Sequence, residues 1–251
     1  MRFNLALAES ALELNDFAAT EQAAAAAFGE ASTDEQRAQA QLLQGRLAYA
    51  RNDMKGAQAI FDKVSMGRDE ASAVRALLEN VKLKRETNQI TLQQAAEALE
   101  ALRYRWRGDG TEMEIIQALG HVYEDMGRWR EALGVMAAAS TRFPDLLASR
   151  RLRIDMGAMF ERLFLDGEAD KLQPIQALGL FYEFKDLTPV GSSGDRMIRL
   201  LSARLVSVDL LDKAAELLQY QVDNRLDGVA RRRSRPIWRR SIWPTGSQKK
   251  R

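Results

Sequence analysis

Short polar segments recur along the chain, and each is followed four residues after its last member by a small apolar residue. The polar segments and the small residues that follow them are Asn52–Asp53 with Ala57, Asn88–Thr91 with Ala95, and Gly127–Arg128 with Ala132. The intervals between the successive alanines are 38 and 37 residues. An interval of this size is typical of a repeated supersecondary unit. Asn15 and Asp16, which precede Phe17, indicate an earlier copy.

The composition predicts helices for these units. The chain has 251 residues, of which 46% are hydrophobic, and it is rich in Ala, Leu, Glu, Gln and Arg. These residues favour helix over strand, and the length allows a sizeable core. The polar segments are therefore expected to be turns between helices, and the fold class is predicted to be all-α.

The segment Leu119 to Pro144 resembles a tetratricopeptide repeat (TPR). The residues that carry the resemblance are Leu119, Gly120, Tyr123, Ala132, Ala139 and Pro144. Ile116 and Met136 stand where the family usually has tryptophan and phenylalanine, and both remain apolar. The resemblance implies a right-handed α-solenoid of antiparallel helix pairs over residues 1–230. It also implies a non-catalytic scaffold that binds a partner protein, or further repeats of a longer chain.

Small residues are expected where the two helices of a pair cross. A glycine inside a helix costs about 0.5–1 kcal/mol relative to alanine, so Gly120 indicates that a neighbouring helix passes close to it. The residues predicted to pack the repeats are Gly45, Ala57, Phe61, Leu119, Gly120, Tyr123, Ala132 and Pro144.

One region departs from the family pattern. Leu178, Gly179 and Tyr182 repeat the Leu-Gly-x-x-Tyr pattern of a first helix, but residues 188–195 follow where a second helix is expected. Pro189, Gly191 and Gly194 predict a loop there, and Asp195 is the expected N-cap of a helix that runs to about Val208.

The family resemblance places one face of each first helix in a groove that binds peptides. The candidate groove residues are Arg46, Tyr49, Gln117, His121, Glu124 and Asp125, with Ala50 at a matching position. His121 also suggests a catalytic role, but no nucleophile or carboxylate stands at a recognisable spacing from it. A helical enzyme would instead need a deep pocket that joins His121 to acidic groups.

Several kinds of site are excluded by composition or spacing. The chain has no cysteine and one histidine, so it has no disulfide framework, thiolate metal site or two-histidine zinc motif. No cofactor or metal is expected. The first residues interleave Glu9 and Glu13 with apolar residues, which does not fit a signal peptide or a membrane span. A cytoplasmic protein is expected.

A segment of alternating basic and aromatic residues precedes the TPR-like motif. Arg103, Tyr104, Arg105, Trp106 and Arg107 alternate in a way that can serve nucleic-acid binding. Cations near a helix C-terminus and aromatic packing between repeats explain the same residues.

Residues 231–251 differ abruptly from the rest of the chain. They hold nine Lys or Arg and no acidic residue, and without them the chain has 28 basic and 35 acidic residues. A basic arm with Trp238 and Trp243 would bind nucleic acid or an anionic surface.

The genetic code allows another interpretation of residues 231–251, which is translation in the wrong reading frame. Read one base earlier, permitted codons for residues 232–251 give Gln-Val-Ala-Thr-Asp-Leu-Ala-Ala-Ile-Tyr-Leu-Ala-Asp-Arg-Lys-Pro-Glu-Glu-Ala, the first helix of another repeat and the start of its second helix. Part of this result is forced. The shifted residue at 238 and at 243 must be leucine or methionine, that at 239 alanine or glutamate, and that at 244 alanine.

The chain is expected to begin with the first helix of a repeat. Leu7 occupies a repeat position in a helix that starts almost at residue 1, with no polar helix ahead of it. Terminal repeats of an intact solenoid have a solvent-adapted outer face. Exposed apolar edges are therefore expected at both ends, as in a piece of a longer bacterial solenoid.

Overall fold

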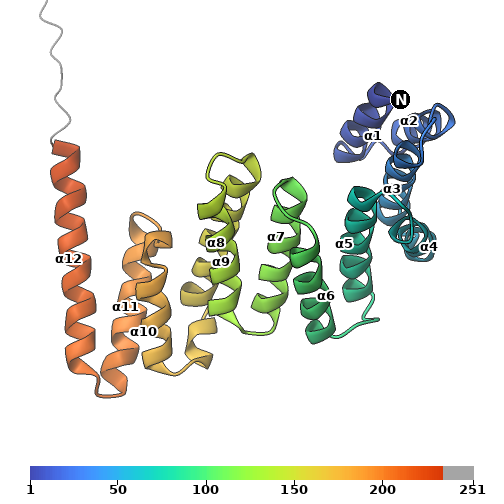
Figure 1. Ribbon diagram of the computed structural model, residues 1–251. Coiled ribbons are helices and arrows are strands. Elements are labelled where there is room, and N and C mark those ends of the chain that lie inside the picture. Colours follow the sequence, from blue (N-terminus) through green and yellow to red (C-terminus); the bar gives the residue numbers. More distant parts are fainter. Residues whose placement is uncertain (234–251) are drawn as a thin grey trace, which may run out of the picture. The chain divides into compact units, whose positions relative to one another are not determined.

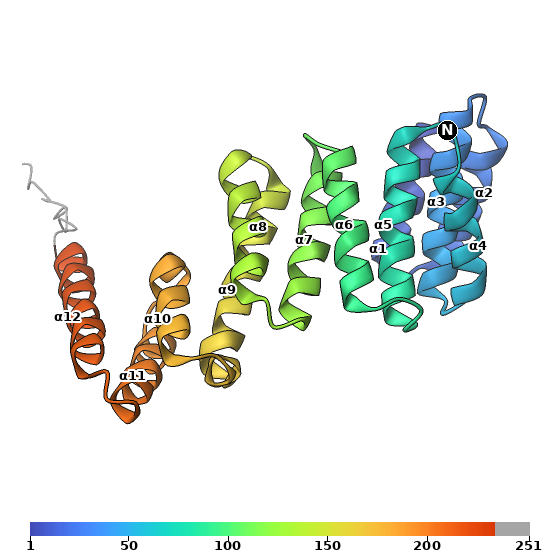
Figure 2. The same ribbon diagram turned by 60° about the horizontal axis from the view of Figure 1, so that its bottom comes forward.

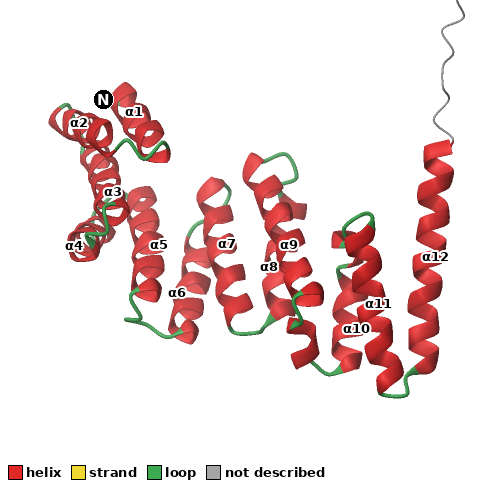
Figure 3. Cartoon of the chain, turned by 180° about the vertical axis from the view of Figure 1, so that it is seen from behind, coloured by secondary structure: helices red, strands yellow, loops and turns green. Residues whose placement is uncertain are grey.

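The computed structural model describes residues 1–233, and within them every regular element is a helix (Figures 1 and 3). The α-helices are α1 (Arg2–Glu13), α2 (Phe17–Gly29), α3 (Asp34–Ala50), α4 (Met54–Ser65), α5 (Glu70–Glu86), α6 (Leu92–Arg105), α7 (Gly110–Asp125), α8 (Trp129–Arg142), α9 (Leu147–Leu165), α10 (Pro174–Glu183), α11 (Ser192–Ser207) and α12 (Leu211–Arg233). Two short 3-10 helices are η1 (Glu168–Lys171) and η2 (Lys185–Leu187). Two compact units divide the chain: unit 1 is Met1–Phe160, and unit 2 begins at Glu161.

Unit 1 is a stack of antiparallel helix pairs (Figure 2). The first helices of the pairs are α1, α3, α5 and α7, and the second helices are α2, α4, α6 and α8. Each helix contacts its neighbour along the chain, and each first helix also contacts the first helix of the next pair. The first helices thus form one continuous layer, and the predicted all-α solenoid of helix pairs is confirmed.

The turns within the pairs share one backbone conformation. Asn15, Asn52 and Asn88 have φ values of 59°, 63° and 56°, and Gly127 has a φ of 71°. This left-handed region is open to glycine and tolerated by asparagine. The next residues cap the second helices, as Asp53 does by accepting a hydrogen bond of 2.9 Å from the Gly56 amide. The turns predicted from the polar segments are confirmed.

The two helices of a pair approach closely at glycine. A Cβ atom added to Gly45 would lie 2.6 Å from Cε1 of Phe61, and one added to Gly120 would lie 2.5 Å from Sδ of Met136. Both distances are shorter than van der Waals contact, so these positions accept no larger residue without movement. Ala132 is fully buried beside the second crossing.

The first pair contains a small polar residue at the alanine position. Thr20 lies four residues after the N-cap Asp16 and is fully buried. Its hydroxyl donates a 2.7 Å hydrogen bond to the Asp16 carbonyl, so burial leaves no polar group unpaired. Thr20 escapes the sequence pattern because that pattern has an apolar residue at this position.

Unit 2 contains the irregular region. After α9, Gly167 turns the chain with a φ of 88°, and η1 and α10 follow. Phe164 in the last turn of α9 packs edge-on against Phe181 of α10, with ring centroids 5.8 Å apart. Helix α10 therefore occupies the place of a second helix. The prediction that Leu178, Gly179 and Tyr182 mark a first helix was wrong, because the pattern matches residue types and not the order of the turns.

The next helix begins earlier than predicted. Helix α11 starts at Ser192 with Gly191 as its N-cap, so Gly194 lies in the helix and not in a loop, and Asp195 is not the N-cap. A Cβ atom at Gly194 would collide with the carbonyl oxygen of Pro189. Gly194 is thus required by a close backbone contact, which the sequence pattern does not reveal.

Large apolar side chains are exposed on the first and last described helices. Phe3, Leu7 and Leu14 at α1 are exposed, and so are Leu211 and Leu218 on α12. This agrees with the predicted apolar edges. The basic tail was predicted for residues 231–251. Residues 231–233 belong to α12, and residues 234–251 lie outside the described part of the chain.

Candidate functional site

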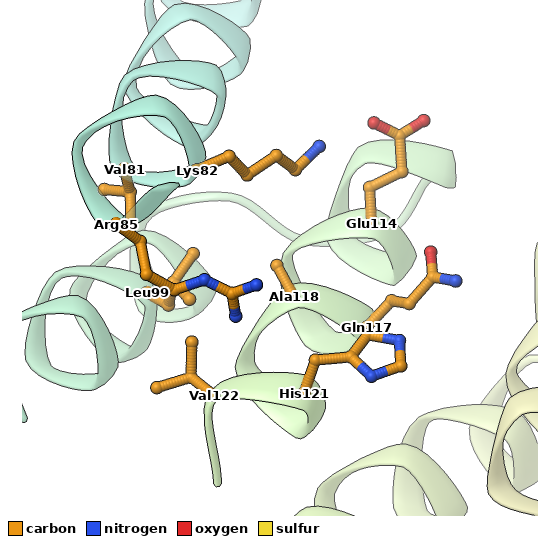
Figure 4. A pocket seen from close by; sticks show the side chains of 9 residues that line it. All are labelled: Val81, Lys82, Arg85, Leu99, Glu114, Gln117, Ala118, His121 and Val122. Atoms are coloured by element: carbon orange, nitrogen blue, oxygen red, sulfur yellow. The ribbon is translucent and has the colours of Figure 1, made fainter. Parts of the chain in front are cut away.

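A pocket of about 210 Å³ opens between α5, α6 and α7 in unit 1 (Figure 4). Its lining residues come from three helices that the turns bring side by side: Val81, Lys82, Arg85, Leu99, Glu114, Gln117, Ala118, His121 and Val122. Helices α5 and α7 are the first helices of successive pairs, and α6 is the second helix between them.

The apolar part of the pocket is made by Val81, Leu99, Ala118 and Val122. Leu99 and Val122 are each 1% exposed, so they belong to the core as well as to the pocket wall. Leu99 lies four residues after Ala95, at the position of Phe61 in the preceding pair. The repeat packing therefore supplies the apolar surface.

The rim of the pocket carries charged and polar side chains. Lys82 and Arg85 extend from α5, and Glu114, Gln117 and His121 extend from α7 (Figure 4). The rim offers cations on one helix and an anion, an amide and an imidazole on the other. Such a rim can hydrogen-bond both to a peptide backbone and to charged side chains.

Ion pairs position several rim groups. The Arg85 guanidinium lies 3.3 Å from the Asp125 carboxylate, and the two side chains are 38% and 48% exposed. The Lys82 ammonium lies 3.5 Å from the Glu79 carboxylate. At this exposure each pair contributes little stability, so the cations are held in place but can exchange partners at low cost.

Four of the predicted groove residues gather at this pocket. Gln117 and His121 line it, and Glu124 lies 3.2 Å from Nδ1 of His121. Asp125 joins the site through Arg85. The Gln117 amide also donates to the Asp155 carboxylate on α9.

Arg46 and Tyr49 lie elsewhere on the first-helix layer. Both are partly buried on α3, outside the pocket lining. The Tyr49 hydroxyl donates to the Glu86 carboxylate, next to Arg85 on α5. Burial, followed by this hydrogen bond and the Glu86 charge, raises the pKa of Tyr49 to about 12.

The contacts of Tyr49 and Arg85 occupy equivalent positions in successive pairs. Tyr49 and Arg85 each lie three residues before the turn residue of their pair, Asn52 or Asn88. Each bonds to the residue two before the next turn residue, which is Glu86 for Tyr49 and Asp125 for Arg85. The same position therefore links first helices once by a hydroxyl and once by a guanidinium.

Lys82, Arg85 and Leu99 were not identified as site residues from the sequence. A count back from the turn residues would have found two of them. Lys82 lies six residues before Asn88, as Arg46 lies six before Asn52. Arg85 lies three before Asn88, as Tyr49 lies three before Asn52.

The repeat-packing residues are mostly in the core. Tyr123 is 7% exposed, its hydroxyl donates a 2.9 Å bond to Glu100, and the Arg128 guanidinium lies 4.5 Å from its ring centroid. Burial and the bond to Glu100 raise the pKa of Tyr123. Ala57, Phe61, Leu119 and Ala132 are buried. Pro144 is exposed and follows the end of α8.

The alternating basic and aromatic segment is only partly packed. Tyr104 is 67% exposed, with the Arg103 and Arg107 guanidinium groups 5.2 and 5.6 Å from its ring centroid. The prediction that it packs between repeats was wrong. The Trp106 indole instead donates a 2.9 Å bond to Asp109.

The acidic groups near His121 are Glu114 in the pocket lining and Glu124, 3.2 Å from Nδ1. Among the nine lining residues there is no hydroxyl or thiol to act as a nucleophile beside His121. Within the described part of the chain, no three His, Cys, Asp or Glu residues are grouped to hold a metal ion. No described helix is long and apolar enough to cross a membrane.

Comparisons with known proteins return similarity in fold only. No family model matches the chain, and no curated protein matches it. One solved structure with a similar fold contains the nearly identical TPR-like repeats of a Podosopora anserina protein described as a putative kinesin light chain. It is 15% identical, covers 82% of this chain and 100% of that chain, and has a TM-score of 0.44. A structure of a single-residue variant of those repeats is 16% identical, covers 80% of this chain and 100% of that chain, and has a TM-score of 0.43. The TPR-like description of this chain follows from its own helix pairs, turns and glycine crossings.

Proposed function

We propose that the protein is a non-catalytic scaffold that binds a segment of another polypeptide along the first-helix layer of unit 1. The observation that carries this proposal is the pocket between α5, α6 and α7, which combines an apolar floor with a mixed polar rim. A bound segment would place one apolar side chain in the pocket and its backbone against the rim.

The size of the pocket favours a side chain over a metabolite. Pockets for small-molecule ligands typically enclose about 300–1,000 Å³. The pocket here measures about 210 Å³. A single anchoring side chain in a well-packed pocket commonly supplies much of the binding energy of a peptide or protein interface.

A polar position outside the pocket extends this surface. Arg46 makes no hydrogen bond or ion pair with another described residue and lies on α3, the neighbouring first helix. An extended or helical segment that lies across α3, α5 and α7 would meet Arg46, then Arg85, then His121. This order gives the segment a direction, because a cation, an ion pair and an imidazole differ in what they bind.

The experiment is to select binders from a displayed library of random 12-residue peptides and to measure their affinity for two variants. Ala118→Trp fills the pocket and should weaken binding of the selected peptides by about tenfold or more. Ala101→Trp adds the same side chain at an exposed position of α6 outside the lining, and it should leave affinity unchanged. Equal affinity for both variants, or no selected peptide at all, would show that this pocket is not the binding site.

A further inference from the structure

Helix α12 has two apolar stripes, and only one of them is covered. Ala214 and Leu217 are 3% and 0% exposed on the side that packs against α11. The second stripe is formed by Leu211, Ala215, Leu218 and Val222, whose spacing of four, three and four residues places them on one helix face. All four are exposed, with Leu211 at 55%, Leu218 at 43% and Val222 at 50%.

The other helix pairs show what covers this stripe. Leu218 is the eighth residue of α12. The eighth residues of α2, α4, α6 and α8 are Ala24, Phe61, Leu99 and Met136, and they are 0%, 1%, 1% and 0% exposed. The position that is exposed in α12 is therefore fully buried in four second helices.

The covering residues come from the first helices on both sides. Phe61 on α4 meets Gly45 of α3, its own first helix, and shares one cluster with Ala76 and Leu83 of α5, the first helix of the following pair. A second helix thus uses this position to pack between its own first helix and the one that comes after it. The stripe of α12 has the residue types for such stacking but no covering helix among the described residues.

In the shifted reading frame, the codons of residues 232–251 encode residue types that suit a first helix. In the shifted frame the residue at 238 is leucine or methionine and that at 239 is alanine or glutamate. These positions lie 37 residues after Leu201 and Ser202 of α11, which are 3% and 4% exposed. Ser202 stands seven residues before Asp209, as Gly120 stands seven before Gly127. The shifted frame therefore restores a large apolar residue and permits a small one where a first helix needs them.

We propose that the exposed stripe of α12 is the stacking surface for the first helix of a further repeat, and that this helix is encoded one base out of frame with residues 232–251. The helix would begin near position 229, which is 37 residues after Ser192. Helix α12 has 23 residues, whereas α2, α4, α6 and α8 have 13, 12, 14 and 14. In the restored protein α12 would end near Asn224, after 14 residues, at the length of the other second helices.

The first test replaces residues 233–251 in the full chain by the shifted sequence and measures amide hydrogen exchange over residues 211–223. Exchange should slow by about tenfold or more relative to the unaltered chain, because a packed helix then covers the stripe. Leu218→Glu should abolish this protection in the shifted chain and change exchange little in the unaltered chain. If the shifted chain aggregates, a peptide of the shifted sequence added to a chain that ends at Gly228 should give the same protection.

Three results would overturn the proposal. The first is unchanged exchange with the shifted sequence in both formats. The second is slower exchange in the unaltered chain than in a chain without residues 232–251, to the same extent as with the shifted sequence. This would make the basic tail the occupant. The third is protection in the unaltered chain that rises with protein concentration, which would make a second copy the occupant.

The gene provides an independent test. The codons for residues 232–251 should specify a helix with apolar residues at the stated positions, and the shifted frame should stay open beyond position 251. A stop codon in the shifted frame before that position would refute the proposal.

Discussion

In unit 1 one residue in the left-handed region and one N-cap join the two helices of a pair, as Asn52 and Asp53 do between α3 and α4. In unit 2 the 3-10 helix η1 lies between α9 and α10, and its carbonyl groups are not paired by a regular helix. The Arg204 guanidinium of α11 donates to the carbonyls of Ala169, Asp170 and Leu172. The backbone polar groups of a short turn are hydrogen-bonded within the turn, whereas those of the irregular connection depend on a side chain from a later helix.

The largest expected effect separates a covered second helix from an uncovered one. Phe61→Ala should lower the free energy of unfolding by about 3–5 kcal/mol, because it removes a fully buried ring from unit 1. Leu218→Ala at the equivalent position of α12 should cost less than about 1 kcal/mol, since this side chain is already 43% exposed. Urea unfolding measures both, and equal costs would mean that the two positions are not equivalent.

Removal of the side chain that supports η1 should have the next largest effect. Arg204→Met keeps the apolar stem but removes the guanidinium donor from the carbonyls of Asp170 and Leu172, at a cost of about 1.5–3 kcal/mol, while the Ala169 carbonyl still accepts from the Leu172 amide. We expect a lower stability of unit 2 in urea unfolding of the full chain. The near-ultraviolet circular dichroism signal of packed aromatic side chains such as Phe181 and Tyr182 would report it. Arg204→Lys, which retains the charge but not the planar fork, should recover only part of this loss. No loss with Arg204→Met would show that η1 does not depend on Arg204.

The crossing of α7 and α8 offers a test inside the regular unit. Ala132→Leu adds a branched side chain at a fully buried position and should destabilise the protein by about 1–3 kcal/mol. Thermal unfolding would measure this change, with Ala137→Leu on the same helix as a control at a less buried position. An unchanged Tm for Ala132→Leu would contradict the helix register described here.

The smallest effect compares the two glycine crossings. Gly45→Ala should cost about 1 kcal/mol, because the new Cβ meets the rigid Phe61 ring. Gly120→Ala should cost less, since the flexible Met136 side chain can move and alanine favours the helix by about 0.5–1 kcal/mol. Gly134→Ala, which meets nothing within 4 Å, should stabilise α8. The three changes in Tm should follow this order, and a reversed order of Gly45→Ala and Gly120→Ala would refute the argument from side-chain stiffness.

Much of unit 1 is predictable because its signals are local. A turn residue such as Asn52 and a crossing residue such as Gly120 are recognisable from neighbours a few positions away in the sequence. Gly194 is not, because the reason for glycine there is the Pro189 carbonyl on the other side of a turn. The same limit applied to α10, whose residues match a first helix although the order of turns makes it a second one.

The candidate site was only half predictable for a related reason. Gln117 and His121 lie in the repeat that carries the clearest motif, so the resemblance led to them. Lys82 and Arg85 lie in a repeat without that motif, and only the register of turn residues across two pairs connects them to the same pocket. The apolar floor depends on Leu99, a core residue whose second role follows from packing.

The paired contacts between first helices have a mechanical consequence. The contact between α3 and α5 includes a neutral hydroxyl that donates to Glu86, whereas the contact between α5 and α7 includes the exposed Arg85–Asp125 ion pair beside the hydrogen bond from Arg75 to Thr111. Dissolved salt screens an exposed ion pair and affects a hydroxyl donor less. Ionic strength should therefore soften one joint of the solenoid selectively, and the softened joint is the one beside the pocket.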